Sequence, residues 1–246
     1  MGREHGLGAP GDALRPVPAS RIKKNRSRAK EPPKIKPVAD DVVDKTLPYL
    51  PSPIAAMVRL QRLTGMRPGG VCAMRPCDID TSHDVWVYVP WEYKSDHHED
   101  CQRFVPFGPK SQSILVPYLI DAEDNPEKWL FSPKESMSER HRKARKHRKT
   151  KVQPSQQDRR KPNPKCLPKE KYDKDAYCRA IRRAARKAGV PHWSPNQLRH
   201  SALTERRAKE GVEAAQLMGN HKNVQITEIY AEKDIAKALE LARKYG

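Results

Sequence analysis

The chain has 246 residues, of which 36% are hydrophobic and 32% charged, and its formal net charge is +19. This length and composition support one large domain or two small ones with solvated arms and loops, and the charge predicts a polyanionic partner. No apolar run approaches the roughly 20 residues that span a bilayer, and residues 1–18 contain no apolar stretch, so we expect no signal peptide, no membrane association and a cytoplasmic location.

The first 40 residues mix proline, glycine and basic side chains with almost no large apolar groups. Such a segment cannot bury enough apolar surface to fold alone, so residues 1–40 are predicted to be a basic, largely disordered linker or arm. A solvated tail and a linker that follows a DNA backbone both fit this composition. An ordered domain is predicted from residue 41 to residue 246.

The first half of this domain combines helical and strand patterns. Apolar residues recur at near-helical spacing over 54–63, and Gly65 predicts the end of that helix. The runs VWVYV at 85–89 and RFVPF at 103–107 predict two strands joined by a polar hairpin tip. A short helix is predicted over 113–120.

A second basic tract covers residues 134–171. Its centre at 140–149 has no apolar stripe, and four prolines follow within the next twenty residues. We therefore predict an inserted surface loop that is disordered without a partner. DNA contact and simple solvation both remain open for it. The candidate DNA-binding residues are Arg140, Arg142, Lys143, Arg145, Lys146, Arg148 and Lys149.

The last part of the chain is predicted to be helical. A helix over 175–188 should end at Gly189. Ser194 then stands as an N-cap, Pro195 at the first helical position and Gln197 three residues after the cap, which predicts a capping box. That helix should run to about residue 210. Short helices around His221 and Tyr230 and a final one over 234–244 should follow.

The cysteines give no sign of a disulfide framework. Their number is five and none forms a CxxC pair, which indicates a reducing compartment. His97, His98 and Cys101 lie close together and could be imagined as zinc ligands. Without a second pair of ligands at finger-like distance, a polar hairpin turn is the preferred interpretation, and no metal is expected.

Four polar residues from distant parts of the chain predict chemistry on a phosphodiester. Arg67 and Arg199 could each bind two phosphate oxygens with a guanidinium that never loses its charge. His221 could add a hydrogen bond to the phosphate. Tyr230 could attack it and form a covalent intermediate that stores the energy of the broken bond. The residues alone therefore indicate a protein that cuts and rejoins DNA.

The sequence around these residues resembles that of the tyrosine recombinases, or phage-type integrases. The resemblance rests on TGMRPG at 64–69, on Lys94 with RFVP at 103–106, on QLRH at 197–200, and on Tyr230 nine positions after His221. These sequence motifs are most similar to those of integrases of bacterial mobile elements. The family implies a mainly α fold with a small antiparallel β-sheet (α+β) over residues 41–246. It also implies a separate N-terminal core-binding domain, so the chain is expected to begin in the linker that follows it.

The resemblance also assigns roles. Tyr230 would attack the scissile phosphate and remain as a 3′-phosphotyrosine, releasing a 5′-hydroxyl. Arg67 and Arg199 would stabilise the charged transition state, and His221 would hydrogen-bond a phosphate oxygen. Lys94 would be the general acid that protonates the leaving 5′-oxygen.

Three features of the motifs bear on activity. Many members carry histidine or lysine at the position of Asn196, which cannot accept a proton at neutral pH. His200 or His221 would then be the alternative bases, and His200 is also a candidate DNA contact. Gly70 stands where an acidic residue commonly supports the first arginine. The hairpin tip is about a residue longer than usual, so His98 is an alternative general acid.

The implied partners are double-stranded DNA and a homotetramer assembled on it, with no small-molecule substrate. Neither metal nor nucleotide is required as a cofactor, because the phosphotyrosine keeps the bond energy, and the chain contains no P-loop. The apolar stripe over 234–244 is expected to dock on a neighbouring protomer or on its own domain. Site-specific recombination or integration in a bacterial cytoplasm, at the nucleoid when bound to DNA, is the predicted function. A catalytically inactive DNA-binding remnant is the alternative.

Overall fold

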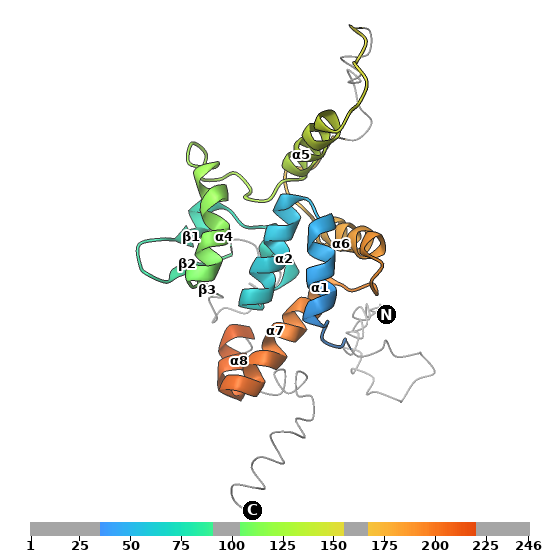
Figure 1. Ribbon diagram of the computed structural model, residues 1–246. Coiled ribbons are helices and arrows are strands. Elements are labelled where there is room, and N and C mark those ends of the chain that lie inside the picture. Colours follow the sequence, from blue (N-terminus) through green and yellow to red (C-terminus); the bar gives the residue numbers. More distant parts are fainter. Residues whose placement is uncertain (1–34, 91–103, 155–166, 220–246) are drawn as a thin grey trace, which may run out of the picture. The chain divides into compact units, whose positions relative to one another are not determined.

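Residues 35–90, 104–154 and 167–219 are described by the computed structural model, and they form a mainly helical fold with one small antiparallel sheet (Figure 1). The predicted α+β class is confirmed. Among the described helices, none is both long and apolar enough to cross a membrane. The helices are α1 Asp40–Thr46, α2 Ser52–Thr64, α3 Pro68–Cys72, α4 Pro109–Ile120, α5 Pro133–Lys146, α6 Lys174–Ala188, α7 Pro195–Glu210 and α8 Val212–Gly219, with 3₁₀ turns η1 Leu47–Tyr49 and η2 Pro76–Asp78.

Helix α2 is the element on which the others pack, since it contacts α3, α4, α5 and α7. Met57, Val58 and Leu60 on its apolar face have no exposed surface. The predicted helix over 54–63 and its end at Gly65 are both confirmed, because Gly65 adopts the left-handed backbone conformation with φ 66°. A side chain with a Cβ rarely adopts that conformation, so glycine suits this helix end.

The sheet holds the short helix α3 in place. Strands β1 Ile79–Asp80, β2 Trp86–Tyr88 and β3 Val105–Phe107 pair antiparallel in that order. Tyr88 of β2 pairs with Val105 of β3, and Phe107 of β3 pairs with Trp86 of β2. The rings of Tyr88 and Phe107 stack, with their centroids 6.0 Å apart. The Tyr88 hydroxyl donates to the Gly70 carbonyl oxygen at 2.9 Å, which ties β2 to α3. The two predicted strands are confirmed, in shorter form.

The helix boundaries follow the capping signals of the sequence. Helix α6 begins after Asp173, whose carboxylate accepts the Ala176 N–H, and ends at Gly189 with φ 68°. Helix α7 begins with the predicted capping box, in which the Ser194 N–H donates to Gln197 Oε1 at 2.9 Å. The helix predicted over 113–120 is confirmed as α4. The hairpin tip, the short helices at His221 and Tyr230, and the final helix over 234–244 lie outside the described residues.

The segment before α1 is ordered, which corrects the prediction of disorder for its last residues. The Val38 N–H donates to Ser201 Oγ at 2.9 Å, and Gln197 Nε2 donates to the Lys36 carbonyl oxygen at 3.1 Å. Val38 is also buried against the core. Residues 36–38 therefore lie along α7, because backbone hydrogen bonds and one apolar side chain compensate for the loss of chain entropy.

The prediction of an irregular, disordered loop in the second basic tract is wrong for its first third, which forms α5. Ser132 caps this helix by accepting the Lys134 N–H, and Pro133 occupies its first position. Glu135 in the first turn and basic residues in the last turn complement the helix dipole. Ser132 followed by Pro133 repeats the pattern at the start of α7, so the start signal was present in the sequence.

Helix α5 docks through polar contacts. The Glu139 carboxylate accepts the Ser52 N–H and the Ser52 hydroxyl, both at 2.8 Å, at the first residue of α2. Lys143 forms an ion pair with the same carboxylate. The Tyr172 hydroxyl donates to Ser136 Oγ at 2.6 Å. Ser136 and Glu139 are both buried, and an apolar stripe is not needed.

Replacing Glu139 with glutamine should weaken this docking. Burial raises the pKa of Glu139, but hydrogen bonds from Lys143 and Ser52 outweigh it and hold the pKa below its usual value. Glu139→Gln should therefore lower the free energy of unfolding by about 1–2 kcal/mol at neutral pH, measured by urea denaturation. Because the folded pKa is depressed, the advantage of the native chain is full above the unfolded pKa of about 4.3 and shrinks as pH falls below it.

The matched control is Glu135→Gln on the same helix. Glu135 forms a half-exposed ion pair with Lys128 at 3.1 Å and faces the N-terminus of α5, so its loss should lower the free energy of unfolding by less than about 1 kcal/mol. Equal effects of the two substitutions, or a Glu139→Gln effect that persists unchanged at pH 3, would contradict the docking role of Glu139.

Candidate active site

The guanidinium of Arg199 lies where three helices meet. Its Nη1 donates to the Gly65 carbonyl oxygen at 2.7 Å, and its Nη2 donates to the Gly219 carbonyl oxygen at 2.6 Å. Gly65 ends α2, Gly219 is the last residue of α8, and Arg199 itself belongs to α7. With Arg199 only 7% exposed, both bonds are shielded from water.

Electrostatics favours a cation at this position. Gly65 is the C-cap of α2, and the last carbonyls of a helix have no partner within the helix and carry the negative end of its dipole. A buried charge is tolerated only when such groups surround it. Because the guanidinium is a planar fork, the two carbonyls of Gly65 and Gly219 fix the plane of Arg199.

Arg67 is brought to the same end of α2. It follows Gly65 by two positions and caps α3, where its carbonyl oxygen accepts the N–H groups of Gly70 at 2.9 Å and Val71 at 3.3 Å. Its side chain is half-buried. Arg199 bonds the carbonyl of Gly65, and Arg67 follows Gly65 by two residues. The structure therefore brings together two arginines that are 132 positions apart in the sequence.

A buried pair of polar residues supports the turn that carries Arg67. Gln61 Nε2 donates to the Met66 carbonyl oxygen at 3.1 Å, and the Tyr177 hydroxyl of α6 donates to Gln61 Oε1 at 3.1 Å. Burial raises the pKa of Tyr177 well above its usual value, so its phenol keeps its proton and remains a donor. The sequence analysis missed this pair, although a glutamine on the buried face of an apolar helix was a usable signal.

The N-terminal turn of α7 presents Asn196. It is the second residue of the helix and is exposed, next to first-turn N–H groups that lack helical partners. Arg199 follows three positions later on the same face. His200 is buried, with Nδ1 3.4 Å from Thr204 Oγ1. The role of His200 in DNA contact stays a prediction.

Other nucleophiles near Arg67 are disfavoured. Cys72 of α3 is buried, and burial, with the negative charge of Asp173 adding to it, raises the pKa of its thiol to about 12. A thiol with that pKa carries almost no thiolate at neutral pH. Cys72 is therefore a core residue.

The remaining candidates fall into two groups. Three candidates, Lys94, His221 and Tyr230, lie outside the described residues, as do His97, His98 and Cys101. The strands that flank the segment containing Lys94, β2 and β3, are adjacent and antiparallel. The basic candidates lie apart from the arginine pair, since α5 contacts the first residue of α2 and Arg199 contacts its end. The exposed residues Arg140, Arg142, Lys143, Arg145 and Lys146 are on α5, and Arg148 and Lys149 follow it.

A mainly helical domain with a small sheet, in which arginines from two distant motifs meet at one helix end, is the architecture of a tyrosine recombinase catalytic domain. The sequence matches the model of the Phage integrase family over residues 40–237. The chain therefore belongs to the phage integrase family. A comparison with curated proteins finds no match.

Solved structures share the fold. The XerA recombinase is 20% identical over 88% of this chain and 67% of its own, with a TM-score of 0.54. The Tn1549 transposon integrase in complex with circular intermediate DNA is 14% identical over 87% of this chain and 67% of its own, with a TM-score of 0.57. A lambda integrase dimer bound to a COC′ core site is 14% identical over 84% of this chain and 51% of its own, with a TM-score of 0.56. The chain thus spans between half and two thirds of these proteins.

Replacing Arg199 with lysine should separate charge from geometry. A lysine ammonium keeps the charge but cannot span the carbonyls of Gly65 and Gly219 as the guanidinium fork does. Losing one buried charge-assisted hydrogen bond should lower the free energy of unfolding by about 1.5–3 kcal/mol, measured by urea denaturation.

Arg206→Lys is the control for this measurement, because Arg206 lies on the exposed side of the same helix. Its substitution should leave the unfolding midpoint unchanged within error. If Arg199→Lys unfolds at the same midpoint as Arg206→Lys, the two carbonyl contacts do not hold the helix ends together.

Proposed function

We propose that this chain cuts and rejoins double-stranded DNA at specific sites through a 3′-phosphotyrosine on Tyr230, and that it recombines or integrates DNA as a tetramer. Membership of the phage integrase family supports DNA recombination as the broad activity. The DNA complexes of the Tn1549 and lambda integrases support duplex DNA as the substrate. Neither a metal nor a nucleotide enters the proposed reaction.

The observation that carries this proposal is the double contact of Arg199. The two carbonyls that it binds each precede another candidate by two residues, Arg67 after Gly65 and His221 after Gly219. Consecutive Cα atoms are about 3.8 Å apart, so covalent geometry keeps each candidate's Cα within about 7–8 Å of the carbonyl-bearing residue. This contact supports a common region for Arg67 and Arg199, and we propose that His221, two residues after Gly219, joins them there.

The chemistry of the proposal balances without a cofactor. The Tyr230 hydroxyl gives its proton to a base, His200 or His221, as its oxygen attacks phosphorus. A P–O bond to tyrosine forms, and the P–O bond to the 5′-oxygen breaks. Lys94 gives a proton to the leaving 5′-oxygen, with His98 as the alternative donor. Arg67, Arg199 and His221 stabilise the charge on the non-bridging oxygens. Rejoining is the reverse attack by a 5′-hydroxyl on the phosphotyrosine.

Removing the phenol should abolish covalent chemistry and spare binding. We expect the native protein, incubated with sheared genomic DNA and then denatured, to retain enriched DNA fragments that sequencing can identify. Tyr230→Phe should lose these covalent fragments, because phenylalanine has no oxygen to form the phosphodiester. Sequencing the retained fragments would also reveal the target site.

The control is equilibrium binding to the same DNA, measured by fluorescence anisotropy, which Tyr230→Phe should leave within about twofold. Adducts that survive Tyr230→Phe would refute Tyr230 as the nucleophile. Native protein that binds DNA but never forms an adduct would instead support the inactive DNA-binding remnant.

Asn196 offers a test of the missing base. Asparagine can donate to phosphate but cannot accept a proton, whereas a histidine can act as a general base near neutral pH. Asn196→His should therefore raise the rate of adduct formation by about tenfold or more, and the gain should appear as pH rises through about 6.5. Single-turnover rates between pH 5.5 and 8 would measure it.

Asn196→Gln serves as the control, since it keeps an amide at the same exposed position and should leave both the rate and its pH dependence unchanged. An Asn196→His rate equal to that of the native protein at every pH would show that a base at this position does not contribute.

A further inference from the structure

A concave surface lies between α5 and α6, near the start of α2 and so away from the Arg199 contact at Gly65. This cleft, called the basic cleft below, has a volume of about 740 Å³ and is closed on one side by η1 and the start of α2. Eight basic and only two acidic side chains line it. Of the candidate catalytic residues that the structure describes, Arg67, Asn196 and Arg199, none contributes to it. The positive charge of the basic cleft is therefore separate from the charge of Arg67 and Arg199.

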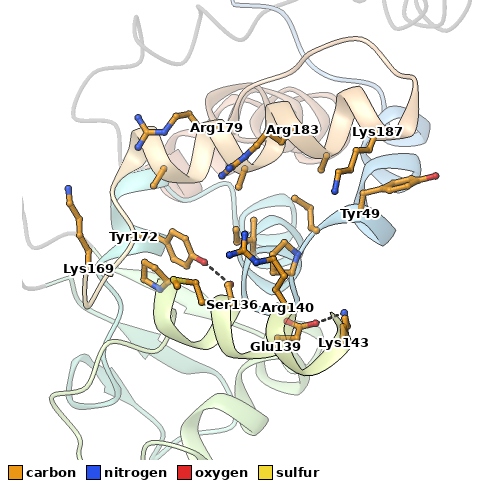
Figure 2. A pocket seen from close by; sticks show the side chains of 18 of the residues that line it. Tyr49, Ser136, Glu139, Arg140, Lys143, Lys169, Tyr172, Arg179, Arg183 and Lys187 are labelled. Atoms are coloured by element: carbon orange, nitrogen blue, oxygen red, sulfur yellow. Dashed lines mark hydrogen bonds and ion pairs between the residues drawn. The ribbon is translucent and has the colours of Figure 1, made fainter. Parts of the chain in front are cut away.

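Most of the basic side chains stand on two facing walls, as Figure 2 shows, whereas Lys169 and Lys171 lie on the segment that precedes α6. One wall is α6, whose cations recur at helical spacing along one face: Arg179, Arg183, Arg186 and Lys187. At 1.5 Å per residue these positions cover about 12 Å of helix. The other wall is α5, which contributes Arg140 and Lys143.

The two acidic residues of the basic cleft are already engaged. Glu139 accepts hydrogen bonds from Ser52 and pairs with Lys143, and Asp173 caps α6 and pairs with Lys169 at 2.7 Å. Arg179 approaches Asp173 only at 4.0 Å. Like charges on facing walls repel one another, so the basic cleft favours an added anion.

Four of the cations keep their full charge available. Within the part of the chain that the structure describes, no ion pair is formed by Arg140, Arg183, Arg186 or Lys187, and all four are exposed. A row of several cations over about 12 Å matches a chain of phosphates better than a single anion, because a DNA strand carries one charge per 3.4 Å of helix axis.

Helix α2 sets the separation between the two basic regions. Ile54 near its start lines the basic cleft, and Gly65 at its end is bound by Arg199. Thirteen residues of helix span about 20 Å, which equals about six base pairs of duplex. A duplex engaged by the catalytic arginines and extending past six base pairs has phosphates at the distance of the basic cleft.

We infer that the basic cleft binds the phosphate backbone of the duplex that flanks the cleavage site. This inference rests on the proposed function, since it takes the flanking DNA to belong to the molecule that is cut. The basic cleft contributes affinity without sequence readout, because phosphate contacts position a protein and carry no base information.

The test compares two double variants of equal charge. Arg140→Gln/Arg183→Gln removes one cation from each wall of the basic cleft. Arg182→Gln/Arg206→Gln removes two exposed cations that lie outside it, on α6 and α7, and that belong to none of the candidate DNA-binding residues. Binding to a 40-base-pair duplex of random sequence is measured by fluorescence anisotropy from 50 to 300 mM salt.

The cleft variant should lose about 1.8 from the slope of log K against log salt, since each lost phosphate contact removes about 0.9. The same relation predicts roughly thirtyfold weaker binding at 0.15 M salt. The outside variant should change far less. On the captured target site, trimmed to five base pairs on each side of the cleaved phosphate, the cleft variant and the native protein should bind alike.

Equal losses in the two double variants, or no loss in either, would overturn the inference. So would a cleft defect that persists on the trimmed duplex, or one seen only with poly-glutamate as the ligand, which would indicate an acidic protein segment as the occupant. None of these outcomes affects the proposed function, which depends on the Tyr230 adduct.

Discussion

The site depends on one interaction, the pair of hydrogen bonds from the Arg199 guanidinium to the carbonyls of Gly65 at the end of α2 and of Gly219 in α8. It can form only because α7 packs closely on the end of α2. A Cβ built on Gly65 would lie 3.4 Å from the Cβ of Ala202, and the left-handed backbone there already favours glycine. One glycine thus allows the close approach, ends the helix and presents the carbonyl that the guanidinium binds. Any shift of α7 would move Arg199 relative to Arg67, because Arg199 bonds the turn after α2 and Arg67 belongs to that turn.

Buried polar pairs, together with apolar packing, hold this region in register. Gln61 and Tyr177 fix the carbonyl of Met66, and Trp193 donates to Thr46 at 3.1 Å just before α7 begins. An unpaired buried polar group costs about 1–3 kcal/mol, so such pairs penalise every arrangement in which they do not meet. Leucine in place of these residues would fill the same space with weaker directional preference. The arginine pair therefore rests on a support that specifies orientation as well as distance.

Sequence patterns predicted those parts of the fold that local chemistry decides. Gly65, Gly189 and the capping box at Ser194 fixed helix ends correctly, because backbone conformation and side-chain caps act over a few residues. Helix α5 was missed, because its docking face is Ser136 and Glu139, and a search for apolar periodicity does not register a polar contact face. The meeting of Arg67 and Arg199 was expected from family resemblance. The physical cause of this meeting is a pair of backbone carbonyls, and since every residue has a backbone carbonyl, the amino-acid sequence does not reveal it.

The two basic regions handle charge in opposite ways. Arg199 is buried and held by two backbone carbonyls, so in the proposed reaction it is oriented before DNA arrives and loses little freedom on binding. The cations of the basic cleft are exposed and repel one another, so they gain most from counterion release and are screened by salt. Helix α2, rigid and about 20 Å long, separates the two regions and keeps their spacing constant. Under the proposed function, a protein of net charge +19 in this way combines a fixed contact at the reacting phosphate with diffuse attraction elsewhere along the duplex.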